Sequence, residues 1–502
     1  MRNALVKSLL LSAACVGASP AFAQEEGTSS DGLGEIIVTA QKRAENIQDV
    51  PIAISAVGSE DLESRGISSI DSLGTIAPNV KIERAPSSKT ITQIAIRGSV
   101  TINPAITWEP AVGLYLDGVY IAKAQGSIFD IADLERVEVL RGPQGTLYGR
   151  NALAGAINLI TKKPSGEAGG SMELTYGAYD YKKIKGILDL PQMGIFSAKL
   201  SGQYVKRDGL VDIVPNPVAG VLSALPNVVN QTDTIDSGSF MAQVRAQLSD
   251  SVTIDYTYDY NKQKQRPPFA QLLRVNRNGD PRDIFDPASP SFPFGGAFFP
   301  LHLYANPKRQ SVASIDGNVY ERSRAYGHAL TLTADLGNAT LKSITAYRDL
   351  AWSDGLDLDG SPTPVAFTQR ITDYHALSQE LQLTGTAFSD QLNYVLGAFY
   401  FKEKAETLGP QVFFSGGADF QSDYGSHTKA FALYAQLDYK ITDALKLSLG
   451  GRYTHETKDV RRYLRVNFDA ANGIFSPVVV ANIPYGGVPD VEELPVRPDA
   501  HK

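Results

Sequence analysis

From Ser171 onward, apolar or aromatic residues alternate with polar ones along the chain. In residues 252–260, for example, Val, Ile and Tyr alternate with Thr and Asp. A period of two is typical of β-strands that have one apolar and one polar face. It predicts strands near residues 171–176, 184–190, 195–205, 239–248, 252–260, 324–335, 339–348, 372–384, 392–403, 429–439 and 445–455. A soluble β-sandwich and a membrane β-barrel share this alternation, so the period alone leaves both open.

The connections between these predicted strands differ in length in a regular order. The short ones lie at residues 191–194, 249–251, 336–338, 385–391 and 441–444, and the long ones at 206–238, 261–323, 349–371 and 404–428. Short turns on one side and long loops on the other are typical of outer-membrane barrels. A sandwich has no reason to sort its loops in this way. The connections therefore favour an antiparallel transmembrane β-barrel.

Residues 46–164 have a mixed pattern. Short helices are predicted at residues 59–65 and 69–76, and strands at 90–96, 112–116 and 136–140. Asp117-Gly118, between two strand-like runs, has the chemistry of a type I′ hairpin turn. We therefore expect a separate α/β domain ahead of the barrel.

Four glycines follow the last of these strands: Gly142, Gly145, Gly149 and Gly155. A phosphate-binding loop would require a Gly-Lys-Ser/Thr sequence and a helix after it, whereas here an apolar strand follows. We interpret the glycines as backbone turns with positive φ angles.

The start of the chain predicts export. Residues 1–23 combine Arg2 and Lys7 with a short apolar run and an Ala21-Phe22-Ala23 cleavage site, as in a signal peptide. The only cysteine, Cys15, lies inside this segment, so the mature chain has no disulfide and no thiolate site. The net charge of −7 and the pI near 5.5 argue against a nucleic-acid binder. The 23 Tyr and 20 Phe suit a sheet with aromatic girdles.

The segment 24–45 is a leader. Its polar part, residues 24–34, is followed by a β-branched run: Ile36, Ile37, Val38, Thr39 and Ala40. It has high strand propensity and nothing nearby to pair with. It could be the first strand of the next domain, or a strand that adds to a sheet edge of another protein. Its position directly after the polar part of the leader favours the second interpretation.

Three motifs occur in a fixed order: ITQIAIRGS, VGLYLDGVY and RVEVLRGPQGTLYGRNALAGAINLITKKP. Together they resemble the plug of TonB-dependent outer-membrane receptors. The resemblance implies an N-terminal α/β plug domain (residues 46–165) followed by an antiparallel transmembrane β-barrel (166–502), with about half of the family's 22 strands present. In addition, residues 36–40 resemble the TonB box, the segment through which this family receives energy from its inner-membrane partner. We expect a truncated receptor, since about eleven strands would leave an unpaired edge in lipid.

The resemblance implies energy-coupled uptake of a ferric siderophore or another large nutrient across the outer membrane, with TonB and its inner-membrane complex as partners. No enzyme activity, cofactor or metal site is implied. A passive porin-like channel, a non-functional receptor fragment and a secreted β-rich enzyme or adhesin are the alternatives.

The resemblance also suggests functional residues. Arg97 and Arg141 match plug arginines that pair with barrel glutamates in the family, and Glu380 matches one such wall position. Candidate ligand contacts are Trp108, Tyr120, Phe269 and Phe294, the last two in the long loop 261–323, where aromatic residues and arginines suit a planar or anionic ligand. The run DGLDLDG (354–360) hints at calcium but lacks the full ligand spacing, so we interpret it as a solvated acidic loop tip.

Overall fold

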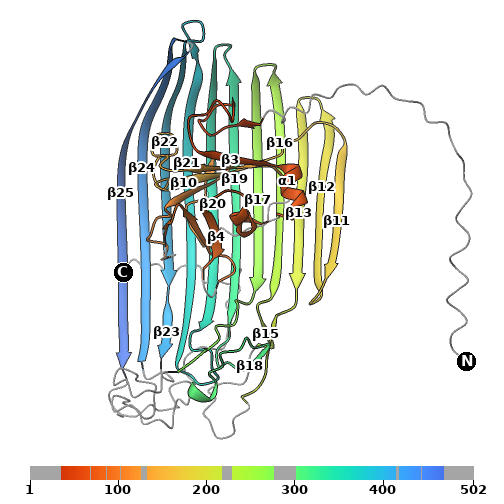
Figure 1. Ribbon diagram of the computed structural model, residues 1–502, viewed down its shortest axis with the longest axis vertical. Coiled ribbons are helices and arrows are strands. Elements are labelled where there is room, and N and C mark those ends of the chain that lie inside the picture. Colours follow the sequence, from red (N-terminus) through yellow and green to blue (C-terminus); the bar gives the residue numbers. More distant parts are fainter. Residues whose placement is uncertain are drawn as a thin grey trace, which may run out of the picture.

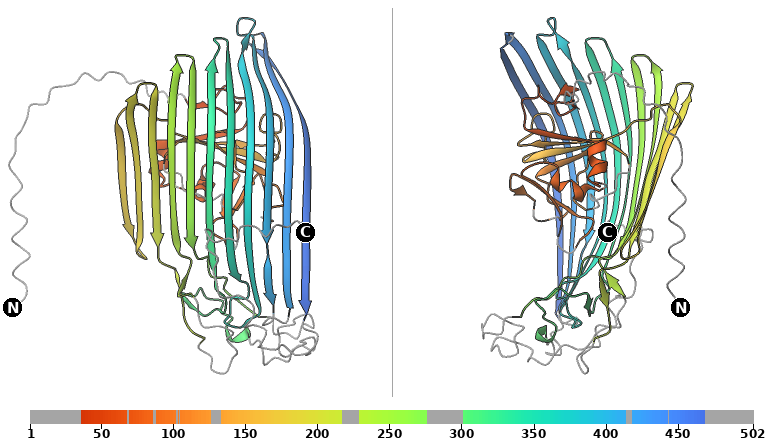
Figure 2. Two further views of the ribbon diagram at one scale, coloured as in Figure 1. Left: turned by 180° about the vertical axis from the view of Figure 1, so that it is seen from behind. Right: turned by 45° about the vertical axis from the view of Figure 1, so that its right-hand side comes forward.

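The computed structural model describes residues 36–468, except 68, 86–87, 102, 104, 126–132, 217–228, 276–300, 414–417 and 443. It has two parts: a small α/β domain, and a tall antiparallel sheet, here called the wall, that curves around it (Figures 1 and 2). The predicted signal peptide and most of the leader lie outside the described residues. No helix among the described residues is long and apolar enough to cross a membrane.

The plug is built on a five-stranded sheet with the order β3-β9-β10-β7-β8. These strands are β3 (Ile54–Gly58), β7 (Val112–Leu116), β8 (Val119–Tyr120), β9 (Leu134–Arg141) and β10 (Gly155–Thr161). Helix α1 (Ser59–Ser64), the 3₁₀ helix η1 (Ile70–Thr75) and a smaller sheet of β4 (Val80–Arg84), β5 (Thr92–Ile96) and β6 (Ser99–Val100) complete it. Its main core joins α1 and η1 to the inner strands, with Leu62, Leu73 and Val139 all buried.

The turns of the plug follow the sequence chemistry. Asp117 and Gly118 have φ angles of 48° and 85°, as a type I′ hairpin requires, and they join β7 to β8. Gly142 and Gly149 also have positive φ angles, whereas Gly145 does not, so the expectation is wrong for that residue. At Gly149 the plug backbone lies directly against the Arg452 guanidinium of the wall.

Eleven long strands form the wall, each hydrogen-bonded antiparallel to the next. They are β11 (Gly169–Gly177), β12 (Tyr181–Met193), β13 (Phe196–Arg207), β16 (Ile235–Ser249), β17 (Val252–Gln265), β19 (Tyr320–Asp335), β20 (Ala339–Asp357), β21 (Ala366–Ala387), β22 (Leu392–Leu408), β24 (Ala418–Thr442) and β25 (Leu445–Phe468). Every strand predicted in this region is present. Within the described residues, β11 and β25 are the two edges of the sheet.

The outward face of the wall carries an apolar band that covers only part of the length of the strands. On β22 the outward residues are Tyr394, Leu396 and Tyr400, and beyond them Lys402 and Lys404 take the same face. Tyrosine and histidine rings from β17, β19 and β20 contact one another at one level of the sheet, as in an aromatic girdle. An apolar band below charged residues is what a strand needs to cross lipid and emerge into water.

The short turns lie where they were predicted, but several long loops are shorter than expected. Strand β20 continues to Asp357 and β24 begins at Ala418, whereas the alternation had predicted loops from 349 and up to 428. Crossing lipid requires about 9–11 residues per strand, and these strands have 19 and 25. Backbone pairing therefore continues above the apolar band, where the outward residues are polar and the sequence alternation fades.

Loops at the outer end carry small elements of their own. These are β14 (Val211–Ile213), β15 (Gln231–Thr232), β18 (Val312–Ala313), β23 (Pro410–Phe413) and the 3₁₀ helix η2 (Leu301–Leu303), near the bottom of Figure 1. The short turns mark the opposite, inner end, as in outer-membrane barrels.

Candidate functional site: the contact between plug and wall

The β-branched run near the N-terminus is folded onto the plug. Strand β1 (Ile37–Val38) pairs antiparallel with β2 (Glu45–Asn46), so the expectation that the run has nothing nearby to pair with is wrong. Val38 and Ala40 are buried in a core shared by plug and wall residues. Ile36 and Ile37 remain exposed. The sequence did not indicate the partner strand β2, because its residues Glu45 and Asn46 have low strand propensity.

Glu138, on β9, holds this segment from the plug side. The Thr39 amide donates to Glu138 Oε1 over 2.8 Å, and the Thr39 hydroxyl donates to the same oxygen over 3.1 Å. Arg136 Nε also donates to Glu138 Oε1, over 2.9 Å. Glu138 is fully buried, so its charge depends on these donors for compensation.

The wall holds the same segment from the other side. Lys42 Nζ lies 3.3 Å from Glu380 Oε1 on β21, and the Tyr434 hydroxyl donates to Glu380 over 2.6 Å. Arg43 lies 2.8 Å from Asp438 on β24. Both wall carboxylates are buried, so removing either cation would leave an uncompensated charge. We call Thr39, Lys42, Arg43, Glu138, Glu380 and Asp438 the inner cluster.

The predicted pairing of Arg97 and Arg141 with Glu380 is wrong. Glu380 does face the plug, but its cationic partner is Lys42, and the structure brings neither Arg97 nor Arg141 to it. Arg97 is exposed with a φ angle of 52°, and Arg141 is half-buried at the end of β9. Among the residues that the structure describes, neither arginine forms an ion pair.

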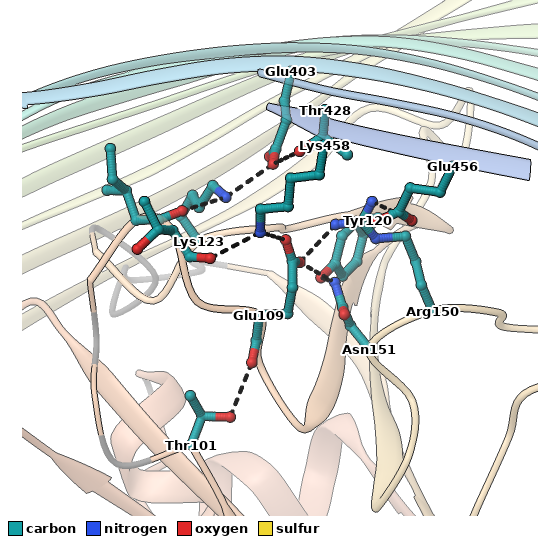
Figure 3. Close-up of polar contacts among 12 residues, drawn as sticks. Thr101, Glu109, Tyr120, Lys123, Arg150, Asn151, Glu403, Thr428, Glu456 and Lys458 are labelled. Carbon is teal, nitrogen blue, oxygen red and sulfur yellow. Dashed lines mark hydrogen bonds and ion pairs between the residues drawn. The ribbon is translucent and has the colours of Figure 1, made fainter. Parts of the chain in front are cut away.

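A second group of charges joins plug and wall further outward, and we call it the middle cluster (Figure 3). Glu109 of the plug forms ion pairs with Arg150, at 2.6 Å, and with Lys458 of β25, and it accepts a hydrogen bond from the Asn151 amide over 2.6 Å. Arg150 reaches Glu456 of β25 at 2.7 Å. Burial alone would raise the pKa of Glu109, but Lys123 and Arg150 outweigh it and hold that pKa at about 2. Glu109 is thus ionised at any physiological pH.

Lys123 completes the middle cluster. Its ammonium lies 3.0 Å from Glu403 of β22 and donates to the Ile106 carbonyl over 2.9 Å. Thr428 of β24 donates to the same carboxylate over 2.9 Å. Lys123 and Glu403 are both almost completely buried.

A single wall carboxylate also holds an outer loop of the plug. Glu321, fully buried on β19, accepts from the Lys89 and Thr90 amides and from the Ser88 and Thr90 hydroxyls. The Trp352 indole donates to the Thr90 hydroxyl over 2.8 Å. Sequence reasoning missed Glu321, since a lone Glu at a strand start carries no pattern.

A cavity of about 280 Å³ lies between the plug and the outer half of the wall. Plug residues Asn103–Trp108 without residue 104, and Gln125, form one side, and the wall contributes Trp352, Arg370, Thr372, Thr407, Tyr424 and Arg462. Arg370 stacks on the Trp352 ring at 5.0 Å. Aromatic rings and guanidinium groups at one cavity can bind a planar or anionic group.

The structure places the four predicted ligand residues differently. Trp108 lines this cavity and is 57 % exposed. Tyr120 is buried below, against Tyr115 and Phe401. Phe269 lies elsewhere, against the core of the small outer sheet. Phe294 lies outside the described residues.

The DGLDLDG run is not a solvated loop tip, so that interpretation is wrong. Asp354 is 1 % exposed and forms an ion pair with Arg370, and Asp357 is 6 % exposed at the end of β20. The strand continues through most of this run, and residues 358–365 connect it to β21, which sequence alternation could not show.

Comparison with known proteins gives two matching family models. Residues 46–156 match the TonB-dependent receptor plug domain, and residues 242–482 match the TonB-dependent receptor-like β-barrel. The pesticin receptor of Yersinia pestis is 32 % identical over 203 residues, which are 40 % of this chain and 29 % of that protein. An iron-regulated outer membrane virulence protein of Vibrio cholerae is 28 % identical over 213 residues, 40 % of this chain and 31 % of that protein.

Solved structures share the fold. The ferric yersiniabactin uptake receptor of Yersinia pestis superposes with a TM-score of 0.65 at 18 % identity, covering 83 % of this chain and 60 % of that one. The ferripyoverdine receptor of Pseudomonas aeruginosa gives 0.63 at 15 % identity, covering 86 % and 55 %. The chain thus spans less than two thirds of these relatives.

Proposed function

Because this chain belongs to the family of TonB-dependent receptors of the outer membrane, which are receptors and transporters rather than enzymes, we propose that it serves energy-coupled uptake of a ferric siderophore or a similar large nutrient. The observation that carries this proposal is the inner cluster. It holds one short N-terminal segment to plug and wall at once, at the end of the molecule opposite the cavity.

Residues 36–40 are the proposed TonB box. Ile36 and Ile37 are 46 % and 41 % exposed, and β1 has β2 on one side only among the described strands. A partner strand could add to the other edge and gain main-chain hydrogen bonds. Pulling the segment away would separate Thr39 from Glu138 and Lys42 from Glu380, and the plug would then lose its inner attachment to the wall.

The cavity is the proposed ligand site. Its volume of about 280 Å³ is at the small end for ligand pockets, so a siderophore would also contact the outer loops. Arg370 and Arg462 would face the acidic groups of such a ligand, and Trp108 a planar ring. Two of the structural relatives are receptors for ferric yersiniabactin and for ferripyoverdine, which agrees with this ligand class.

The cavity is linked to the plug through Trp352. This residue lines the cavity and donates to Thr90, whose backbone and hydroxyl are held by Glu321. A ligand that moves Trp352 would change the support of the outer plug loop. Transport would then follow a population shift toward the state with a released N-terminal segment.

The test compares Ile37→Pro with Ile37→Ala in cells that lack other siderophore receptors. Proline removes the backbone N–H group that a partner strand would use, whereas alanine keeps it. Because the Ile37 side chain is exposed, neither substitution removes a buried side chain. With a panel of radioiron-loaded siderophores, we expect Ile37→Pro to bind one of them at the surface but not to import it. Equal import by both variants would contradict the role of this segment.

A further inference from the structure

Three aspartates from two distant parts of the chain lie close together at the outer end of the wall. Asp316 lies between β18 and β19, Asp357 ends β20, and Asp359 follows two residues later. Carboxylate oxygens of the three residues all lie within 4.8 Å of one another. The region lies at the bottom of Figure 1, near β15 and β18. Its position is separate from the inner and middle clusters and from the ligand cavity.

Among the described residues, no cation compensates the buried charges of this cluster. Asp316 and Asp357 are each only 6 % exposed. Asp316 Oδ1 and Asp357 Oδ2 are buried and have no hydrogen-bond donor among the described residues. No lysine or arginine in the described part of the chain forms an ion pair with any of the three aspartates. Buried carboxylates in this situation either take up a proton or bind a cation.

The backbone holds one oxygen of Asp357 and one of Asp359 in place. Asp357 Oδ1 accepts from the amides of Asp359 and Gly360 over 3.1 and 2.8 Å. Asp359 Oδ2 accepts from the Ala366 amide over 3.1 Å. These bonds fix two carboxylates before any cation arrives, and they leave Asp316 Oδ1 and Asp357 Oδ2 free to bind one.

Two glycines bring the segments together. Gly360 has a φ angle of 67°, and a side chain there would meet the Ala270 carbonyl at 2.0 Å. A side chain at Gly317, next to Asp316, would meet the Phe367 ring at 2.4 Å. The loops can therefore approach only with glycine at these positions, and the approach places Asp316 against the end of β20.

We propose that Asp316, Asp357 and Asp359 form a calcium site that ties the loop between β17 and β19 to the end of β20. All donors are oxygens, as calcium prefers, and their separations fit oxygens around an ion with bonds of about 2.3–2.6 Å. The site lies at the outer end of the wall, where β20 ends. Its expected dissociation constant is that of extracellular calcium modules, about 10⁻⁴ to 10⁻³ M.

The experiment uses the full chain in detergent micelles, freed of metal with EDTA and titrated with calcium chloride by calorimetry. We expect one site per chain, with magnesium binding at least tenfold more weakly. Asp316→Asn and Asp359→Asn should each weaken calcium binding about tenfold or more. Asp250→Asn, in an exposed inner turn, removes the same charge and should leave it unchanged.

Calcium should also slow proteolysis of the outer loops in the unaltered chain, and this readout needs no variant that might fail to fold. The proposal is overturned by absence of binding up to about 10 mM calcium, well above the expected range. Equal affinity for magnesium overturns the assignment to calcium, and unchanged binding in both Asn variants overturns the assignment to these residues.

Discussion

At the scale of single residues, the contact between plug and wall depends on buried carboxylates, each held by several donors. Glu138, Glu321 and Glu380 each accept bonds from more than one group. Hydrogen bonds to a charged group contribute about 1.5–3 kcal/mol, more than neutral ones. Such residues are expected to decide which segments of the plug stay in place.

Glu138→Gln tests this for the N-terminal segment. The change keeps the shape but removes the charge that the Thr39 amide and Arg136 share, so we expect the segment to open more easily by about 1–2 kcal/mol. Hydrogen exchange at the Thr39 amide should become about 5- to 30-fold faster. Glu63→Gln, at an exposed position of helix α1, is the control. If the Thr39 amide exchanges as slowly in Glu138→Gln as in the unaltered chain, Glu138 does not hold the N-terminal segment in place.

The sequence predicted part of this arrangement. Motifs placed Glu380 on the wall and facing the plug, but they assigned it an arginine partner, whereas the structure gives it Lys42. These two residues are 338 positions apart, and their contact depends on how the plug sits within the wall. Local patterns do not carry that information. The same holds for Glu321, whose partners at Ser88–Thr90 are backbone amides and hydroxyl groups.

At the scale of elements, sequence alternation found every wall strand but misplaced the outer ends. The pattern follows the lipid-facing band, which on β22 ends near Tyr400, because Lys402 and Lys404 then occupy the outward face. Hydrogen bonding between strands continues beyond that level. Polarity thus reports where the membrane ends, whereas the strand ends depend on pairing.

Leu396→Arg and Leu408→Arg separate these two boundaries. Both residues are exposed on the outward face of β22, at 41 % and 43 %, but only Leu396 lies within the apolar band. Arginine near the middle of a bilayer costs about 2–4 kcal/mol, and close to nothing at its rim. We expect urea unfolding from lipid vesicles to show this loss for Leu396→Arg alone. An equal loss at Leu408 would place it inside the membrane.

At the scale of the whole molecule, the inner cluster, the middle cluster and the cavity follow one another from the inner to the outer end. The plug is therefore attached at several levels, and no single ion pair holds it. The middle cluster also contacts the cavity lining. Lys123 donates to the Ile106 carbonyl and Lys458 to the Thr107 carbonyl, and both Ile106 and Thr107 line the cavity.

Glu109→Gln should loosen this level. Two cations, Arg150 and Lys458, lose their shared partner, and we expect a loss of about 1–3 kcal/mol at pH 7 in thermal or urea unfolding. Glu83→Gln, at an exposed pair with Lys81, is the control. A loss no greater than that of the control would show that the middle cluster contributes little.

The pH dependence of this difference has a definite sign. The pKa of Glu109 is about 2 in the folded protein, below its ordinary value of 4.5. Its contribution is therefore complete above about pH 4.5 and declines as the pH falls toward 2. The difference between the unaltered chain and Glu109→Gln should shrink over that range, and a difference that grows in acid would contradict the assignment.

The ion pairs and hydrogen bonds between plug and wall have a mechanical consequence. Separating two apolar surfaces exposes area at about 25 cal/mol per Å², and the whole surface has to part at once. Charges and hydrogen bonds can instead be exchanged one at a time for bonds to water. A force applied at Ile37 would first act on Thr39 and Lys42, and only later on Glu109 and Lys123. The plug would thus yield in a series of small steps rather than by one large rupture.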